Sequence, residues 1–184
     1  MDNGASSYRR FLEGDNAGMA ELIREYKDGL ALYLCSITRN ICEAEELMEE
    51  TFVRLAVNKP EYTGKSSFKT WLYTIGRNLA IDYVRRRKWI ADIPVHECYK
   101  LTDEQDLEAI YIREEQKVEL RSAMRKLKPD YQQVLWLIYF EEFSNAEAAV
   151  IMHKSKRQIE NLLYRAKVKL KNELEKGGFR YEGL

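Results

Sequence analysis

Residues 144–171, SNAEAAVIMHKSKRQIENLLYRAKVKLK, contain two helix starts separated by a short turn. The first start is the capping box S-x-x-E at Ser144, in which each side chain satisfies a backbone N–H of the other residue. The pattern S-x-x-Q at Ser155 repeats this arrangement. His153 lies between the two starts, where a tight turn needs a positive φ that histidine tolerates better than most non-glycine residues. The stretch therefore predicts a short helix, a tight turn and a longer second helix.

This pair of helices is typical of a helix-turn-helix, in which the second helix enters the major groove of DNA. The first helix is expected over about 145–152, and the second from residue 156 to the stop signal Gly177-Gly178. A plain helical hairpin would show the same two caps. A helix-turn-helix, unlike a hairpin, would need side chains that read bases at the start of its second helix.

Such side chains are present. Arginine can bond guanine, and glutamine or asparagine can bond adenine, in the major groove. Glu160 could accept from cytosine or simply repel phosphate, and Arg165 lies further along, where phosphate is closer. The candidate base-reading and phosphate-binding residues of this half are Lys154, Lys156, Arg157, Gln158, Glu160, Asn161 and Arg165.

The rest of the chain also has helical periodicity. Apolar residues recur every three or four positions over 16–38, 44–55 and 68–83, which predicts amphipathic helices packed as a bundle. Ser67 is placed to cap the third of these helices, and Pro129 suits the first turn of a helix carrying 134–138. Only 9 Gly and 3 Pro in 184 residues agree with an all-α fold.

The periodicity fades in the middle of the chain, where Pro94 and clustered acidic residues occur. We expect an N-terminal helical bundle over residues 1–91, a flexible linker over 92–106, and a C-terminal helix-turn-helix domain over 107–184. No apolar run approaches the roughly 18 residues needed to span a bilayer, and no secretory signal is visible, so a cytoplasmic protein is expected.

Charge is strongly segregated although the net charge is +0. Acidic residues dominate 43–50 and 103–115, whereas basic residues dominate 65–88 and 154–171. This alternation predicts two anion-binding surfaces. The cluster Arg85, Arg86 and Arg87 is suited to neutralising phosphate, although a solvated helix end is the alternative.

The loop over 58–67 precedes the basic helix and offers groups for captured, unstacked bases. Tyr62 could stack on a base, and Thr63, Lys65 and Ser66 could make polar contacts, although the loop could also be a simple connector. Phe68 and Trp71, by contrast, fall on the apolar stripe and are predicted to be core.

Enzymatic chemistry is not indicated. The sequence has no glycine-rich phosphate loop, nucleophile elbow or metal-spaced ligand set. The three cysteines form no C-x-x-C pair and are expected to be reduced thiols, with a zinc site at His96 and Cys98 a minor alternative. We therefore expect no enzyme activity, no metal and no cofactor.

Three stretches resemble a known family. The segments EAEELMEETFVRL (43–55) and FKTWLYTIGRNLAIDYVRRRK (68–88) are similar to region two of extracytoplasmic-function sigma factors. The segment LKPDYQQVLWLIYFEEFSNAEAAVIMHKSKRQIENLLYRAKVKLKNEL (127–174) resembles their region four. The matches cover most of the chain in the family's order and spacing.

The resemblance implies a sigma factor that binds core RNA polymerase, recognises and melts promoters, and needs no cofactor. Region two would read the minus-ten element through Arg77 and Asn78, together with the loop residues and the arginine cluster named above. Region four would read the minus-thirty-five element. The acidic helix would dock on the polymerase through Glu46, Glu49, Glu50 and Arg54, although it could also be a solvated face. Many family members are held inactive by an anti-sigma protein, which is a further possible partner.

The sequence departs from the family pattern at several positions. Members usually carry Gln where this chain has Glu49, and Gly where it has His153 and Arg157. The promoter sequence therefore does not follow from the resemblance. A helix-turn-helix regulator that acts without forming a holoenzyme is the alternative, and it predicts duplex binding by the isolated protein.

Overall fold

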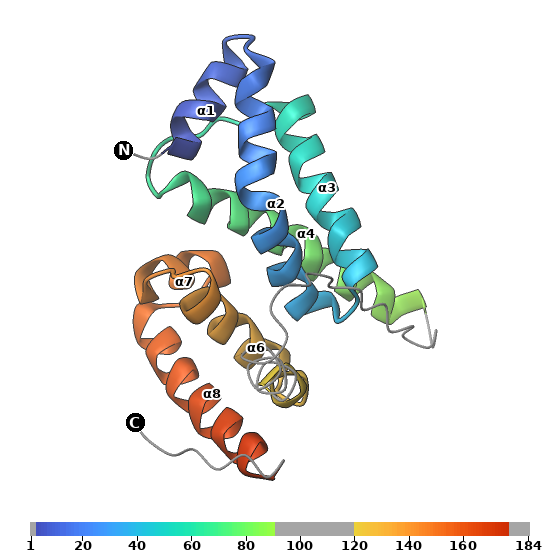
Figure 1. Ribbon diagram of the computed structural model, residues 1–184, viewed down its shortest axis with the longest axis vertical. Coiled ribbons are helices and arrows are strands. Elements are labelled where there is room, and N and C mark those ends of the chain that lie inside the picture. The colour runs from blue at the N-terminus through green and yellow to red at the C-terminus, as the bar shows by residue number, and fades with distance from the viewer. Residues whose placement is uncertain (1–2, 91–119, 177–184) are drawn as a thin grey trace, which may run out of the picture.

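The structure, a computed structural model, describes residues 3–90 and 120–176 (Figure 1). Within these residues every regular element is a helix, which confirms the predicted all-α fold. The helices form an N-terminal bundle, residues 3–90, and a C-terminal bundle, residues 120–176. The proposed linker (92–106), the start of the second proposed domain (107–119) and Gly177-Gly178 lie outside the described residues.

The N-terminal bundle contains α1 (Asn3–Leu12), α2 (Asn16–Thr38), α3 (Ile41–Asn58) and α4 (Phe68–Ile90). The last three are the helices that the apolar stripes predict. The sequence pattern did not reveal α1, which is short and carries only two large buried side chains, Tyr8 and Phe11. Their three-residue spacing is the signal that could have revealed it.

Local caps fix where these helices begin. The Asp15 carboxylate accepts from the backbone N–H of Ala17 at 3.0 Å, and the Asn40 side chain caps α3 in the same way. Ser67 Oγ accepts from the backbone N–H of Thr70 at 3.2 Å, so the predicted cap of α4 is confirmed. Each cap satisfies a backbone donor that would otherwise lack a partner in the first turn.

Phe68 is the centre of an aromatic cluster in the N-terminal bundle. Its side chain is fully buried, and its ring centroid lies 5.5 Å from those of Tyr8 and Trp71, 5.6 Å from Tyr62 and 6.0 Å from Tyr26. Offset and edge-to-face contacts at such distances stabilise beyond the burial of area alone. Phe68 belongs to the core, as predicted, and Trp71 is partly buried and packs against that core.

The C-terminal bundle contains a helical turn at 120–125, followed by α6 (Pro129–Leu135), η1 (Trp136–Phe140), α7 (Asn145–Met152) and α8 (Lys156–Lys176). Pro129 occupies the first turn of α6, as predicted. Both capping boxes form, and His153 has a φ of 52°, which confirms the predicted turn between α7 and α8. The π-helical turn η1 was not predicted.

The two bundles pack against each other. Helix α4 contacts α7, α2 contacts α6 and η1, and Figure 1 shows α7 beneath the first turns of α4. Tyr73 of α4 meets Phe143 edge to face, with ring centroids 5.0 Å apart. Buried apolar side chains from both bundles therefore form one continuous core.

Candidate nucleic-acid interface

Helix α8 exposes the side chains that the sequence assigns to base reading. Ile159 and Ala166 are buried against the rest of the C-terminal bundle and fix which face of α8 points inward. The solvent-exposed surface of α8 carries Lys156, Arg157, Gln158, Glu160, Asn161 and Arg165. This surface is polar, begins at a capped helix start and is not covered by the N-terminal bundle (Figure 1).

Lys154 differs from the other candidates in this half. It lies in the turn between α7 and α8, is half-buried, and its Nζ is 3.3 Å from Asp130 Oδ2. That ion pair ties the turn to the start of α6. Lys154 therefore positions the helix pair in this structure and is less available to DNA than the residues on α8.

The loop between α3 and α4 places its polar groups at the surface. Thr63 and Lys65 are exposed, and Ser66 is half-buried. Tyr62, however, packs its ring on Phe68 and Trp71, and its hydroxyl donates to the backbone oxygen of Ser66 at 2.5 Å. In this state Tyr62 pins the loop to the bundle, and it would have to leave that position to stack on a base.

The basic residues of α4 have different surroundings. Arg85 is exposed and pairs with Asp82 at 3.0 Å, and Arg86 is exposed, with no ion pair to any described residue. Arg87 is only 30% exposed and forms an ion pair with Glu43 of α3, whose side chain is 14% exposed. Arg87 thus joins α3 to α4, whereas Arg86 is free to meet phosphate.

Arg77 and Asn78 lie at the boundary between the bundles. Arg77 Nε donates to Gln133 Oε1 at 3.2 Å, and Asn78 Oδ1 is 2.9 Å from Nε2 of His153. Gln133 belongs to α6 and His153 to the turn before α8. Arg77 and Asn78, two of the residues predicted to bind the minus-ten element, therefore contact the C-terminal bundle.

Two glutamates of the C-terminal bundle, Glu141 and Glu147, contact the N-terminal bundle, and no sequence pattern indicated either contact. Glu141 accepts from the Tyr73 hydroxyl at 2.6 Å and pairs with Lys69 Nζ at 3.0 Å. Burial, and then the neighbouring Glu141 carboxylate, raise the pKa of Tyr73 well above its ordinary value. Tyr73 therefore stays protonated and remains a donor.

Glu147 has two roles. It completes the capping box of α7, and its Oε1 also lies 3.3 Å from the hydroxyls of Ser67 and Thr70 at the start of α4. Burial acts to raise its pKa, but the hydrogen bonds from Ser144, Thr70 and Ser67 prevail, and the pKa lies below its ordinary value. The charged form of Glu147 is thereby favoured at the contact between the bundles.

The acidic face of α3 is open to solvent. Glu46, Glu49, Glu50 and Arg54 are all exposed, and Arg54 pairs with Glu50 at 2.7 Å along the helix. An exposed pair at this spacing contributes little to stability. These side chains are therefore available to a partner.

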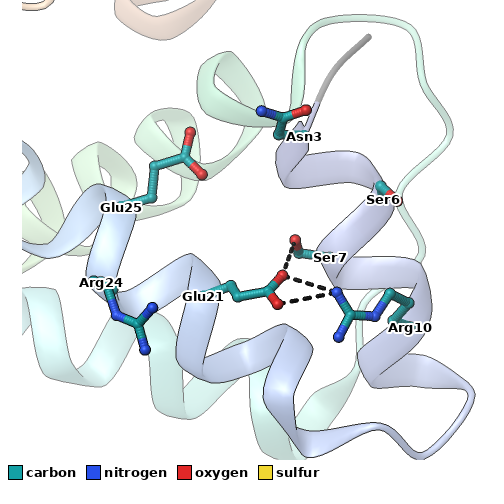
Figure 2. Close-up of a pocket in the computed structure, with 7 residues that line it drawn as sticks. All are labelled: Asn3, Ser6, Ser7, Arg10, Glu21, Arg24 and Glu25. Atoms are coloured by element: carbon teal, nitrogen blue, oxygen red, sulfur yellow. Dashed lines mark hydrogen bonds and ion pairs between the residues drawn. The ribbon is translucent and has the colours of Figure 1, made fainter.

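A pocket of about 430 Å³ lies between α1 and α2, and two of its charged residues, Glu21 and Arg10, pair with each other (Figure 2). The Glu21 carboxylate accepts from Ser7 Oγ at 2.7 Å and from Arg10 Nη1 at 3.0 Å. These contacts hold α1 on α2.

Among residues 3–90 and 120–176 no group of three metal-ligating side chains occurs that could hold a metal ion. The alternative zinc ligands His96 and Cys98 fall outside these ranges. Within the same ranges no helix is apolar and long enough to cross a membrane.

Comparison with known families agrees with this organisation. Residues 22–90 match sigma-70 region 2, and residues 117–170 match sigma-70 region 4. The chain is 32% identical over 158 residues to the RNA polymerase sigma factor YlaC of Bacillus subtilis, covering 85% of this chain and 91% of that protein. It belongs to the extracytoplasmic-function sigma factors. As such, it directs transcription initiation at promoters, and a helix-turn-helix regulator that works without polymerase is not favoured.

Other relatives extend the match. The extracytoplasmic-function sigma factor SigM of Bacillus subtilis is 30% identical over 160 residues, covering 85% of this chain and 95% of SigM. The fold of this sigma factor is also similar to that of RpoE from Bartonella quintana, solved with the anti-sigma factor NepR. That match has a TM-score of 0.69 and 20% identity, and covers 85% of this chain and 96% of RpoE.

Proposed function

We propose that this sigma factor divides promoter recognition between its two bundles. The exposed face of α8 reads the minus-thirty-five element, while α4 and the loop before it bind the minus-ten element. The observation that carries this proposal is the start of α8, where polar side chains of the kinds that bind bases surround a buried anchor, Ile159. We assign residues 1–91 to the first domain and residues 107–184 to the second, with residues 92–106 as the linker.

Core RNA polymerase is the partner through which this division acts. The exposed acidic face of α3 is suited to a basic surface of the polymerase, and Glu46, Glu49, Glu50 and Arg54 are its docking residues. The chain acts in the cytoplasm, supplies no catalytic group of its own and needs no cofactor. An anti-sigma factor is a further partner, supported by the fold shared with RpoE, whose structure contains one.

The face of α8 provides the direct test of base reading. Arg157→Ala or Gln158→Ala is expected to cost about 1–3 kcal/mol of binding at one or two base positions and to relax preference there, because each removes a base-edge contact. The measurement is binding of the reconstituted holoenzyme to minus-thirty-five variants at two salt concentrations. Lys171→Ala, an exposed change further along α8, is the control and should leave base preference unaltered.

Two other results would reassign these residues. A uniform loss over all promoter variants with a smaller salt slope would mean that Arg157 and Gln158 grip phosphate. No effect at these positions, with altered preference in Glu160→Ala or Asn161→Ala, would mean that the base contacts are made by residues further along α8.

A further inference from the structure

Helix α1 lies outside the segment that matches sigma-70 region 2, which begins at residue 22. Its inner face nevertheless reaches the loop between α3 and α4, which runs past α1 in Figure 1. The Tyr8 hydroxyl donates to the backbone oxygen of Pro60 at 2.8 Å, and Lys59 Nζ lies 5.3 Å from the centroid of the Phe11 ring. Two side chains on one face of α1 thus hold the first two residues of that loop.

The start of the loop has a backbone conformation that needs such support. Lys59 has a φ of 42°, in the left-handed region, and a non-glycine residue there carries strain that persists where surrounding contacts hold it. Pro60 has no N–H, so its carbonyl is its one backbone hydrogen-bonding group. Burial raises the pKa of Tyr8 to about 12, so its hydroxyl stays protonated at neutral pH and donates to that carbonyl. Tyr8 therefore fixes the direction in which the loop leaves α3.

Tyr8 and Tyr62 pack on the same pair of rings, one from α1 and the other from the loop. The ring centroid of Tyr8 lies 5.5 Å from those of Phe68 and Trp71. The Tyr62 centroid lies 5.6 Å and 5.2 Å from the same two rings. Tyr8 is 1% exposed, whereas Tyr62 is half-buried. Because the Tyr8 ring rests on the bundle, its bond to Pro60 can persist when Tyr62 turns outward to a base.

Close packing on α2 fixes α1 itself. A Cβ at Gly18 would lie 2.2 Å from the backbone oxygen of Ser7, so the two helices approach this closely only because residue 18 is glycine. Beside this crossing, the Glu21 carboxylate accepts from Ser7 Oγ and from Arg10 Nη1 (Figure 2). The position of Tyr8 is therefore determined by α2, independently of the loop.

We propose that α1 positions the loop between α3 and α4 for promoter recognition, with Tyr8 as the residue that holds this loop in the orientation that reads the minus-ten element. The inference rests on the proposed role of the loop in minus-ten binding. A loop with a fixed start presents Thr63 and Lys65 in one arrangement, so less ordering is needed when a base binds. A loop with a free start fits several bases about equally well, which lowers discrimination between bases more than overall binding.

Tyr8→Phe tests this role, because it removes the bond to Pro60 and keeps the ring in place. Tyr26→Phe is the matched control, since it removes the hydroxyl of another buried tyrosine, from α2, whose ring packs on Phe68. Each variant is combined with core RNA polymerase and a promoter fragment that the unaltered holoenzyme selects from the source genome. Every minus-ten position of the fragment is changed to each other base in turn, and the ratio of affinities for the preferred base and the other bases is measured.

Thr63→Ala and Lys65→Ala show which minus-ten positions the loop reads. We expect Tyr8→Phe to lower the ratio about fivefold at those positions, as loss of one hydrogen bond implies, and Tyr26→Phe to leave it unchanged. Partial misfolding lowers binding to all bases by the same factor and does not alter the ratio.

An unchanged ratio in Tyr8→Phe, or an equal fall in Tyr26→Phe, overturns the positioning role of Tyr8 and leaves the loop's role standing. If neither Thr63→Ala nor Lys65→Ala changes a ratio, the loop does not read the minus-ten element. That result overturns the proposed function of the loop together with the inference.

Discussion

Replacement of Phe68 with alanine is expected to lower the free energy of unfolding by about 3–5 kcal/mol, because it empties the centre of the N-terminal aromatic cluster. Phe68 is fully buried and contacts four other aromatic rings from α1, α2, α4 and the loop before α4. The measurement is chemical denaturation followed by circular dichroism. Because the core is continuous between the bundles, the loss is expected in a single transition.

Val57→Ala is the control, since Val57 lies in the same bundle but is 73% exposed, and the change is expected to stay within about 0.5 kcal/mol. The opposite view of Phe68 is that its ring stacks on a promoter base. Unchanged stability in Phe68→Ala, together with weaker single-strand binding, would favour that view and contradict the packing described above.

Substitutions of the neighbouring residues Arg86 and Arg87 are expected to differ in their effects on stability and on DNA binding. Arg87→Ala should lower the free energy of unfolding by about 2–3 kcal/mol, because it leaves the mostly buried Glu43 carboxylate without its ion-pair partner. Arg86→Ala should change stability by less than about 0.5 kcal/mol, since its side chain is exposed. Denaturation of both variants under the same conditions tests this difference.

For DNA binding by the holoenzyme, Arg86→Ala should have the larger effect of the two substitutions. Arg86→Ala is expected to reduce the salt slope of open-complex formation by about 0.7–0.9 through the loss of one phosphate contact. The double substitution Arg87→Ala with Glu43→Gln also removes the negative charge of Glu43, which Arg87→Ala alone leaves unpaired. It should therefore recover part of the free energy of unfolding lost in Arg87→Ala. If Arg87→Ala is as stable as the parent chain and only the salt slope falls, Arg87 is a phosphate contact and the pair with Glu43 is incidental.

The caps and turns of this protein could be predicted because they are local. Ser67, Ser144 and Ser155 each bond a backbone group within three residues, so the residue types and their spacing determine the helix start. His153 is predictable for the same reason, since the turn between two adjacent capped helices determines its φ. These signals gave the helix-turn-helix and three of the four N-terminal helices.

The contacts between distant helices could not be predicted in this way. Tyr62 has an aromatic ring of the kind that stacks on bases, yet that ring packs on Phe68 because the loop folds back over α4. Arg87 belongs by sequence to a uniform basic cluster, and only the packing of α3 on α4 distinguishes it from Arg86. Glu141 has no sequence signal at all, because its partners Lys69 and Tyr73 lie about seventy positions away and its approach depends on a π-turn.

The central claim is that this chain gives core RNA polymerase its promoter specificity, and run-off transcription tests it most directly. Purified core enzyme is combined with the chain and a fragment library from the source genome, and transcripts are mapped by their 5′ ends. We expect discrete start sites that need both components, share a minus-ten and a minus-thirty-five element, and change when Arg157 or Gln158 is replaced. No added start sites, with the isolated chain binding duplex DNA as a dimer, would contradict it.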